Sequence, residues 1–325
     1  MKSLKLNRII PITLILLIGY LIPIIPLPPY IMHVLILVVM WAYLSTAWSI
    51  LGGAAGQLSL GHAAFFGTGA YTTYFLTVWF GLPPLMNLLV SGLTASLLSV
   101  VIGYPCFRYG LRGVYFALAT IAFTEIMKDL FIYLRELTGG SLGVWMPVLP
   151  EGITTLYFLG KEAYYYVITT LYVVLMIIIN LMGRFREYLT AIREDEDVSA
   201  SIGINVTRYK LLALMISSFF VGVGGAYYIC YFRYINPYVA FGLDTSLQMV
   251  LIGIFGGMYS FWGPLIGSVI LTPIGEYLRI TLGGTYVGSH LLIYGLLLIL
   301  IIRFLPKGIY SILESIYSKY LVRGG

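Results

Sequence analysis

Charged residues are scarce in this sequence of 325 residues. Aspartate, glutamate, lysine and arginine make up 10% of it, whereas hydrophobic residues make up 60%. A soluble domain carries about 25% charged residues, so the composition excludes a water-soluble enzyme or binding module. It predicts an all-α polytopic membrane protein that has the lipid bilayer as its surroundings.

Cysteine is nearly absent as well. Cys106 and Cys230 both lie in apolar segments and have no CxxC spacing, which excludes a disulfide framework and a thiolate metal site. We interpret both as small packing residues and expect neither a metal nor another cofactor. Basic residues in a membrane protein mainly set its orientation, so the net charge of +6 does not predict a nucleic-acid partner.

The sequence also lacks a phosphate-binding loop. The pattern G-x-x-x-x-G-K-[ST] needs a Gly-Lys pair, and the one such pair, Gly160 and Lys161, has Thr155 in place of the first glycine. The chain therefore cannot hydrolyse ATP by that route. We predict a transport subunit that is not itself an enzyme and receives energy from another polypeptide.

Long apolar runs are what the sequence has in abundance. A spanning helix needs about 20 mostly apolar residues, and on that basis we predict about ten spans, with about eight as a lower bound, in a single domain. The domain covers residues 1–325, and its first span is expected to be uncleaved because prolines follow it. The predicted spans are Ile9–Ile25, Ile31–Leu51, Gly61–Phe80, Leu85–Phe107, Val114–Leu134, Tyr164–Gly183, Tyr209–Phe232, Thr245–Phe261, Gly263–Ile280 and Ser289–Phe304.

Lysines and arginines orient these spans, because cytoplasmic loops hold more of them. Six spans precede the basic loop at residues 184–210, which puts that loop and both termini in the cytoplasm. The loop at residues 135–162 is then outside. The predicted location is the cell membrane, inner or plasma. The cations that decide the orientation of the 184–210 loop are Arg184, Arg186, Arg193, Arg208 and Lys210.

The 184–210 loop contains a well-bounded short helix. Four consecutive acidic residues, Glu194 to Asp197, are followed by small residues and then by Gly203. Acidic side chains favour the first turn of a helix, and a glycine after the last turn adopts the left-handed backbone needed there. We therefore predict a helix from Asp195 to Ile202, whose small side chains let another protein approach its backbone.

Two glycine-rich segments interrupt the apolar runs. Residues 51–61 read LGGAAGQLSLG, and Gln57, Ser59 and the following His62 add polar groups to the glycines. A loosened backbone in a membrane either lines a cavity or packs closely against other helices, and both interpretations stay open for this segment. For residues 254–267, IFGGMYSFWGPLIG, we predict packing or a turn.

Glu125 lies about midway along the predicted fifth span, with Lys128 and Asp129 on the same helix face. Ionisable residues inside a bilayer are functional candidates. One interpretation is a buried ion pair between Glu125 and Lys128 in the outer half of the bundle, and the other is a polar contact with a zwitterionic solute. A stand-alone secondary transporter would need several such carboxylates for its coupling ions, and Glu125 is the sole good candidate.

Gly139 to Gly143 matches the nucleophile-elbow pattern G-x-S-x-G around Ser141. The pattern has meaning only between a strand and a helix, and the nearby Trp145 and Pro147 argue against a helix there. We predict a tight turn in the outer loop. The alternative is an intramembrane serine hydrolase with His290 as its base.

Four segments together resemble one known family. They are GQLSLGHAAFFGTGAYTTYFL at residues 56–76, LRGVYFALATIAFTEIMKDL at 111–130, TGGSLGV at 138–144, and a segment at 191–228 that begins AIREDEDVSASIGINV. In combination they resemble the LivM-type permease of high-affinity branched-chain amino acid ABC importers. The similarity continues through residues 244–276 and covers nearly the whole chain after the first span.

This resemblance implies a permease subunit that works with several partners. They are a second, similar permease, two cytoplasmic ATPase subunits and an extracytoplasmic solute-binding protein. The family carries aliphatic amino acids, and similar permeases carry urea or short amides. The predicted substrate-pathway residues are Glu125 and five residues of the membrane motif that resembles the family most strongly. These five are Gly56, Gln57, Ser59, Gly61 and His62.

The resemblance also implies that the loop around residues 191–203 docks on an ATPase. The family signature has Glu-Ala-Ala four residues before a glycine, whereas here Asp197, Val198 and Ser199 precede Gly203. That departure leaves individual contacts open. The predicted coupling residues are Ala191, Arg193, Glu194, Asp197, Ser199, Ala200 and Gly203.

Overall fold

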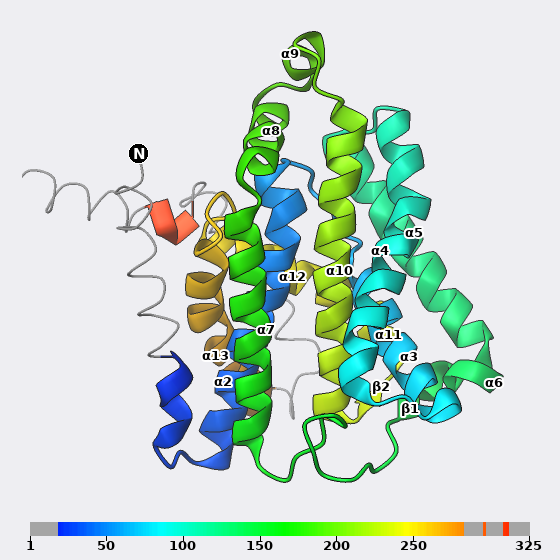
Figure 1. Cartoon of the computed structure of the whole chain (residues 1–325), viewed down its shortest axis with the longest axis vertical. Coiled ribbons are helices and arrows are strands. Elements are labelled where there is room, and N and C mark those ends of the chain that lie inside the picture. Colours follow the sequence, from blue (N-terminus) through cyan, green and yellow to red (C-terminus); the bar gives the residue numbers. More distant parts are fainter. Residues whose placement is uncertain (1–18, 283–294, 297–307, 312–325) are drawn as a thin grey trace, which may run out of the picture.

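The computed structural model describes residues 19–282, 295–296 and 308–311. In these ranges long helices run side by side from one end of the molecule to the other (Figure 1). The all-α membrane fold predicted from composition is confirmed. Most of the predicted spans Ile9–Ile25 and Ser289–Phe304, and His290 with them, lie outside the described residues.

Eight long helices coincide with predicted spans. They are α2 (Pro29–Ser49), α3 (His62–Phe80), α4 (Pro84–Arg108), α5 (Gly113–Tyr133), α7 (Lys161–Leu181), α10 (Val206–Phe232), α12 (Leu243–Gly256) and α13 (Gly263–Leu282). Five segments of the described chain are long and apolar enough to cross a membrane: Pro29–Ala54, Pro84–Arg108, Lys161–Leu181, Val206–Phe232 and Pro237–Gly256.

Shorter elements connect the long helices. Two two-residue strands pair antiparallel, with Val144 opposite Ile235 and Trp145 opposite Tyr234. The short elements are η1 (Ile22–Ile24), the π-helical turn η2 (Ile50–Ala54), α6 (Arg135–Thr138), η3 (Gly140–Leu142), β1 (Val144–Trp145), α8 (Gly183–Glu194), α9 (Glu196–Ser201), β2 (Tyr234–Ile235) and α11 (Pro237–Ala240).

The described loops gather at two opposite ends of the bundle (Figure 1). The α9 end holds residues 55–61, 109–112, 182–205 and 257–262, and there Arg112 pairs with Glu196. The β end holds residues 81–83, 134–160 and 233–236, and there the amide of Met146 donates to the Arg233 carbonyl at 2.8 Å. Phe241, which follows α11, lies deeper in the bundle, beside Gly67 and Tyr71 of α3. Successive loops therefore alternate between the ends, as the predicted span order requires.

Two turns agree with their predictions. Ser141 lies in η3 between Gly140 and Gly143, whose φ angles are +57° and +72°, and β1 follows instead of a helix. The predicted tight turn is confirmed, and the strand-to-helix setting of a nucleophile elbow is not what surrounds Ser141. Helix α12 ends at Gly256, where an added Cβ would lie 1.8 Å from the Gly263 carbonyl oxygen, so the predicted packing and turn are also confirmed.

Helix α10 forms the centre of the bundle and packs against α2, α3 and α4. Its backbone comes very close to its neighbours. A Cβ added at Gly225 would lie 2.0 Å from the carbonyl oxygen of Phe66 on α3, and one at Gly222 would lie 2.7 Å from that of Ser91 on α4. Small residues allow such approach between membrane helices. The glycines of α10 therefore set the spacing of the core.

We predict that Gly225→Ala is more destabilising than Gly224→Ala, one residue away. A methyl group at position 225 meets rigid backbone, whereas at position 224 it meets the end of the Leu44 side chain, which can move. Overpacking of this kind costs about 1–3 kcal/mol. Thermal unfolding of the purified variants measures the difference. Equal destabilisation by the two variants would contradict the packing described for α10.

Candidate functional site

Helix α9 (Glu196–Ser201) begins with a side-chain cap. The carboxylate of Asp195 accepts hydrogen bonds from the backbone amides of Asp197 and Val198, each at 2.9 Å. This satisfies two amides that have no partner within the helix. After the helix, Gly203 has a φ of +91°, the left-handed conformation that favours glycine. The predicted helix from Asp195 to Ile202 is confirmed to within one residue at each end.

Helix α8 (Gly183–Glu194) precedes α9, and we did not predict it from the sequence. Leu189 and Ile192 are buried on one side of α8, whereas Arg184 and Glu187 are exposed. The apolar spacing of Phe185, Leu189 and Ile192 is the signal of an amphipathic helix. Charged residues surround these three apolar residues, and for that reason the segment was not predicted to be a helix.

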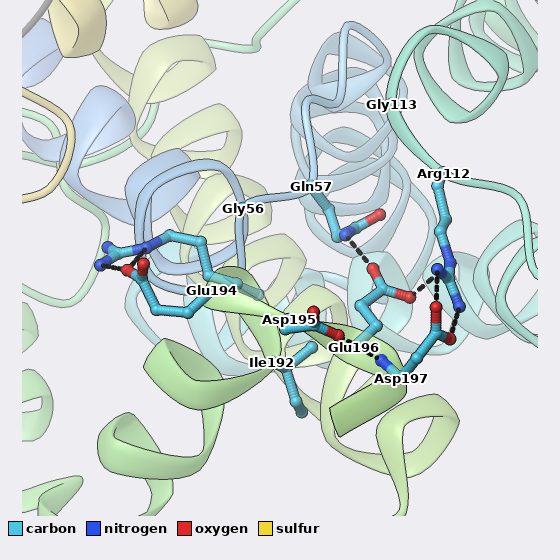
Figure 2. A pocket seen from close by; sticks show the side chains of 11 residues that line it. Gly56, Gln57, Arg112, Gly113, Ile192, Glu194, Asp195, Glu196 and Asp197 are labelled. Atoms are coloured by element: carbon cyan, nitrogen blue, oxygen red, sulfur yellow. Dashed lines mark hydrogen bonds and ion pairs between the residues drawn. The ribbon is translucent and has the colours of Figure 1, made fainter. Parts of the chain in front are cut away.

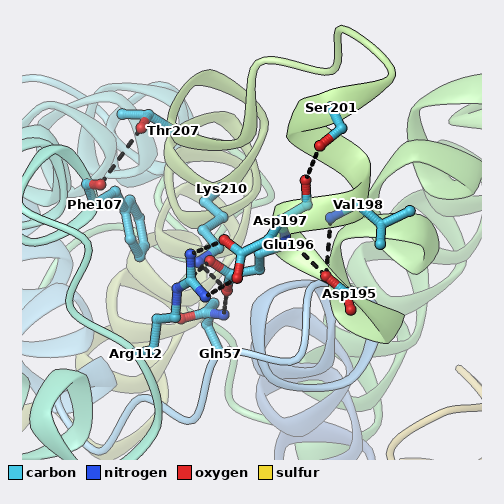
Figure 3. Close-up of polar contacts among 10 residues, drawn as sticks. All are labelled: Gln57, Phe107, Arg112, Asp195, Glu196, Asp197, Val198, Ser201, Thr207 and Lys210. Atoms are coloured by element: carbon cyan, nitrogen blue, oxygen red, sulfur yellow. Dashed lines mark hydrogen bonds and ion pairs between the residues drawn. The ribbon is translucent and has the colours of Figure 1, made fainter.

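Glu196 lies at the centre of an ion-pair network that holds α9 against the bundle (Figure 3). Its Oε2 atom is 2.8 Å from Nε of Arg112, the residue that caps the start of α5. Its Oε1 atom pairs with Lys210 in α10. The exposed fractions of the two side chains are 13% for Glu196 and 3% for Lys210, so water is largely excluded from this pair.

Gln57 and Asp197 extend the network on either side. The side-chain amide of Gln57 donates to Oε1 of Glu196 at 3.0 Å, and Gln57 is itself buried. Asp197 is 81% exposed, and its Oδ1 atom is 2.8 Å from Nη2 of Arg112. One short helix thus contacts the segment before α3, the start of α5 and the start of α10.

The charges of this network affect one another. The hydrogen bond from Arg112 holds the pKa of Asp197 below its usual value, and the same bond raises the pKa of Arg112. A carboxyl pKa that is lowered on folding contributes stability above the unfolded pKa, about 3.9 for Asp, and loses it as the pH falls through the folded value. The Arg112–Asp197 contact is therefore intact at neutral pH and weakens only in acid.

A cleft of about 330 Å³ lies between the α8–α9 segment and residues 55–57 (Figure 2). Glu194 lies on one side of it, and Arg112 and Gln57 lie on the other. Arg193, which also lines the cleft, pairs with Glu194 at 2.7 Å. Within the ranges that the structure describes, no three His, Cys, Asp or Glu side chains form a group able to hold a metal ion.

Arg193 joins α8 to the glycine-rich segment at residues 51–61. Its Nη1 atom donates to the Gly53 carbonyl at 3.2 Å, and its guanidinium lies 4.7 Å from the ring centre of Tyr259. Gly56 has a φ of +68°, and an added Cβ there would lie 2.6 Å from Cγ of Arg193. The absence of a side chain at position 56 is therefore what lets Arg193 lie across this segment.

Deeper in the bundle, Ser59, Gly61 and the following His62 are buried. Both ring nitrogens of His62 form hydrogen bonds. Nδ1 lies 2.9 Å from the hydroxyl of Ser59, and Nε2 lies 2.8 Å from the hydroxyl of Ser217 in α10. The hydroxyl of Ser217 donates to the Ala47 carbonyl of α2 at 2.7 Å. A Cβ at Gly61 would lie 2.5 Å from the carbonyl oxygen of Thr120 on α5. These polar groups connect α2, α3, α5 and α10.

Residues 30–302 match the sequence model of a family described as branched-chain amino acid transport system / permease component. The chain belongs to this permease family. The permease is 30% identical over 288 residues to LivM of Salmonella typhimurium, an alignment that covers 80% of this chain and 65% of that protein. LivM of Escherichia coli strain K12 is 29% identical over 300 residues, which are 84% of this chain and 68% of LivM.

A second type of relative aligns over most of its own length. LivH of Salmonella typhimurium is 23% identical over 291 residues, which are 83% of this chain and 90% of LivH. Both LivM and LivH are named as high-affinity branched-chain amino acid transport system permease proteins. The chain spans about two thirds of the length of the LivM proteins that it matches. No solved structure matches it.

The predicted substrate-pathway residues of the permease fall into three places. Gly56 and Gln57 lie against α8 and α9, and Ser59, Gly61 and His62 lie within the helix core. Glu125 lies on α5, where it forms an ion pair with Lys128 and its side chain is 42% exposed. The ion pair between Glu125 and Lys128 is present, but it is only half-buried in the described chain instead of buried as predicted, and contact of Glu125 with a solute stays a prediction.

The predicted coupling residues of the permease all lie at the α9 end. Most are exposed or half-buried, but Ser199 is only 2% exposed and faces the protein. The exposed side of α9 instead presents Val198, Ala200 and, just past its end, Ile202. The half-buried or exposed predicted residues are Ala191, Arg193, Glu194, Asp197, Ala200 and Gly203.

Three residues that fix the position of α9 were not identified from the sequence as part of this site. They are Arg112, Glu196 and Lys210. Basic residues at span ends were used only to orient the chain, because their charge alone does not identify a partner. The signal that could have identified them is the run of four acidic residues at positions 194–197, because such a run requires nearby cations.

We predict that Glu196→Gln destabilises the permease far more than Asp197→Asn. The first change leaves Lys210 buried without its charged partner, and breaking a buried pair in this way costs about 3–5 kcal/mol. The second removes an exposed contact and should change the free energy of unfolding little. Thermal unfolding of the purified variants at neutral pH checks this. Equal effects would show that the Glu196–Lys210 pair does not hold α9.

Proposed function

We propose that the permease is the membrane-spanning subunit of an ATP-driven importer of branched-chain amino acids. The observation that carries this proposal is α9, a short helix whose exposed side presents Val198, Ala200 and Ile202 to a partner and whose buried side is fixed by Glu196. Such a helix can receive force from a soluble protein and pass it into the membrane. Membership of the permease family and the names of the LivM and LivH relatives support the transport role.

The proposal requires several partners. Two cytoplasmic ATPase subunits supply the energy, because the sequence has no phosphate-binding loop of its own. A second permease subunit completes the membrane part, and an extracytoplasmic solute-binding protein delivers the solute. In this arrangement the α9 end and both termini face the cytoplasm of a multi-pass cell-membrane protein, which is the orientation that the basic residues favour.

Force on α9 reaches three places through short contacts. Arg112 leads to the start of α5, Lys210 to the start of α10, and Gln57 to the segment before α3. ATP-driven closure of the ATPase subunits displaces α9 and, with it, these helix ends and the flanking helix α7. The pathway then changes the side of the membrane to which it is open. A coupling free energy of about 1–3 kcal/mol is ordinary for such transmission.

Within this proposal the predicted pathway residues have different roles. Glu125 remains the candidate for contact with a zwitterionic solute, because it is an ionisable group near the middle of a membrane helix. The contacts of Gly56 and Gln57 with α8 and α9 support a role in coupling. Those of Ser59, Gly61 and His62 support a role in keeping the helices in register while they move.

The solute class has a direct alternative, because similar permeases carry urea or short amides. In vesicles that contain the whole transporter, excess unlabelled leucine, isoleucine or valine should abolish ATP-dependent uptake of labelled leucine, whereas urea and acetamide should not compete. ATP-dependent uptake of labelled urea or acetamide, with no uptake of labelled leucine, would instead support the alternative solutes.

We predict that Ala200→Arg blocks ATPase docking, whereas Ala200→Ser does not. Ala200 is exposed on α9, and a large cationic side chain there keeps another protein's surface away from the helix backbone. Copurification of the ATPase subunits and ATP-dependent leucine uptake should both fall at least about tenfold for the arginine variant, which corresponds to about 1.4 kcal/mol of lost association. Membrane insertion should be unchanged. Normal docking and uptake in that variant would refute the role of α9.

A further inference from the structure

Arg233 follows the last residue of helix α10 in a left-handed backbone conformation. Its φ angle is +63°, and glycine is the residue that most often occupies this position after a helix. A Cβ atom in this conformation crowds the following carbonyl oxygen, which glycine avoids. Among the residues that the structure describes, one other non-glycine residue has a positive φ angle, Leu156 at +45°. Leu156 lies at the same end of the bundle, in the outer loop (residues 135–162).

The side chain of Arg233 contacts the outer loop at two points. Its Nη2 atom donates to the carbonyl of Pro147, and its guanidinium lies 4.6 Å from the ring centre of Tyr157, the residue after Leu156. The backbone adds a third contact, because the Arg233 carbonyl accepts from the amide of Met146 at 2.8 Å. One residue at the end of α10 therefore connects two separate parts of the outer loop.

The loop between these two points forms a turn with its own hydrogen bonds. The amide of Gly152 donates to the carbonyl of Tyr157 at 3.0 Å, and the hydroxyl of Thr155 donates to the carbonyl of Pro150 at 2.6 Å. Leu156 in this turn is only 1% exposed. A strained backbone conformation persists only where the surrounding structure holds it. The left-handed turn therefore depends on its contacts with the rest of the protein.

Backbone strain of this kind gathers at functional sites, where it holds groups in a required arrangement. Glycine at position 233 would avoid the strain, but it would lack the side chain that contacts the outer loop. The same loop presents large apolar side chains to solvent, namely Trp145 (70% exposed), Val148 (82%) and Ile153 (69%). Exposed apolar side chains that lie close together are typical of surfaces that bind a partner. The partner that the proposed function requires at this end is the solute-binding protein.

We propose that Arg233 is a positioning residue for solute delivery, which fixes residues 145–157 of the outer loop in the conformation that the solute-binding protein contacts. This inference rests on the proposed function and adds to it the residue that orders the docking surface. A loop that is already fixed in its bound conformation loses less conformational entropy when the partner binds, so the partner binds more tightly.

The variant Arg233→Gly separates the side chain from the backbone, because glycine keeps the left-handed conformation and removes both side-chain contacts. The measurement is ATP hydrolysis by the assembled transporter at increasing concentrations of the leucine-loaded solute-binding protein. The half-saturating concentration should rise at least about tenfold, because the loop must then be ordered on binding. The basal rate, the maximal stimulated rate and the temperature of thermal unfolding should not fall.

Tyr157 offers a matched pair of variants. Tyr157→Leu removes the ring beside the guanidinium and should also raise the half-saturating concentration, whereas Tyr157→Phe keeps the ring and should leave it unchanged. Hydrogen exchange measures the order of the loop directly. In the absence of the solute-binding protein, the amides of residues 146–157 should exchange faster in Arg233→Gly than in the unmodified transporter.

The outcomes separate the role of Arg233 from the proposed function. If the solute-binding protein does not stimulate ATP hydrolysis by the unmodified transporter, the proposed function fails. If it stimulates the unmodified transporter and the Arg233→Gly variant at the same half-saturating concentration, the positioning role of Arg233 is overturned and the proposed function stands. A fall in the maximal rate alone, with the half-saturating concentration unchanged, would also overturn that role.

Discussion

The ion pair between Glu196 and Lys210 is the contact on which the α9 end depends. Desolvation offsets much of the attraction in a buried pair, so the pair need not add net stability, but the loss of one partner is costly. Its effect is therefore to fix where α9 lies. Arg112 and Gln57 bind the same carboxylate from two other elements, so that one side chain determines the position of α9 relative to three parts of the bundle.

The glycine-rich segment at residues 51–61 continues this connection into the membrane. Its first part contacts α8 through Gly53 and Gly56, and its last part joins the buried hydrogen bonds of His62. The π-helical turn η2 (Ile50–Ala54) and the irregular residues that follow give it a backbone unlike that of the regular helices around it. A segment held at both ends by different helices can pass movement from the surface to the core.

Local signals in the sequence were sufficient for some of these features. The cap at Asp195 and the left-handed Gly203 are set by neighbouring residues, so the limits of α9 could be predicted. The span positions followed from apolar length. The bond between Gln57 and Glu196 joins residues 139 positions apart and depends on how the helices pack, which no local pattern encodes. For the same reason the burial of Ser199 could not be foreseen.

The bond between Gln57 and Glu196 should make α9 and the segment before α3 move as one unit, and a distance measurement tests this most directly. Spin labels at Ile204, whose amide donates to the Ser199 carbonyl of α9, and at Leu58 report the distance within this unit. Labels at Ile204 and Trp145 report the distance from it to the β end. In the assembled transporter, ATP binding should change the second distance and leave the first unchanged. A change in the Ile204–Leu58 distance as large as that in the other pair would contradict this.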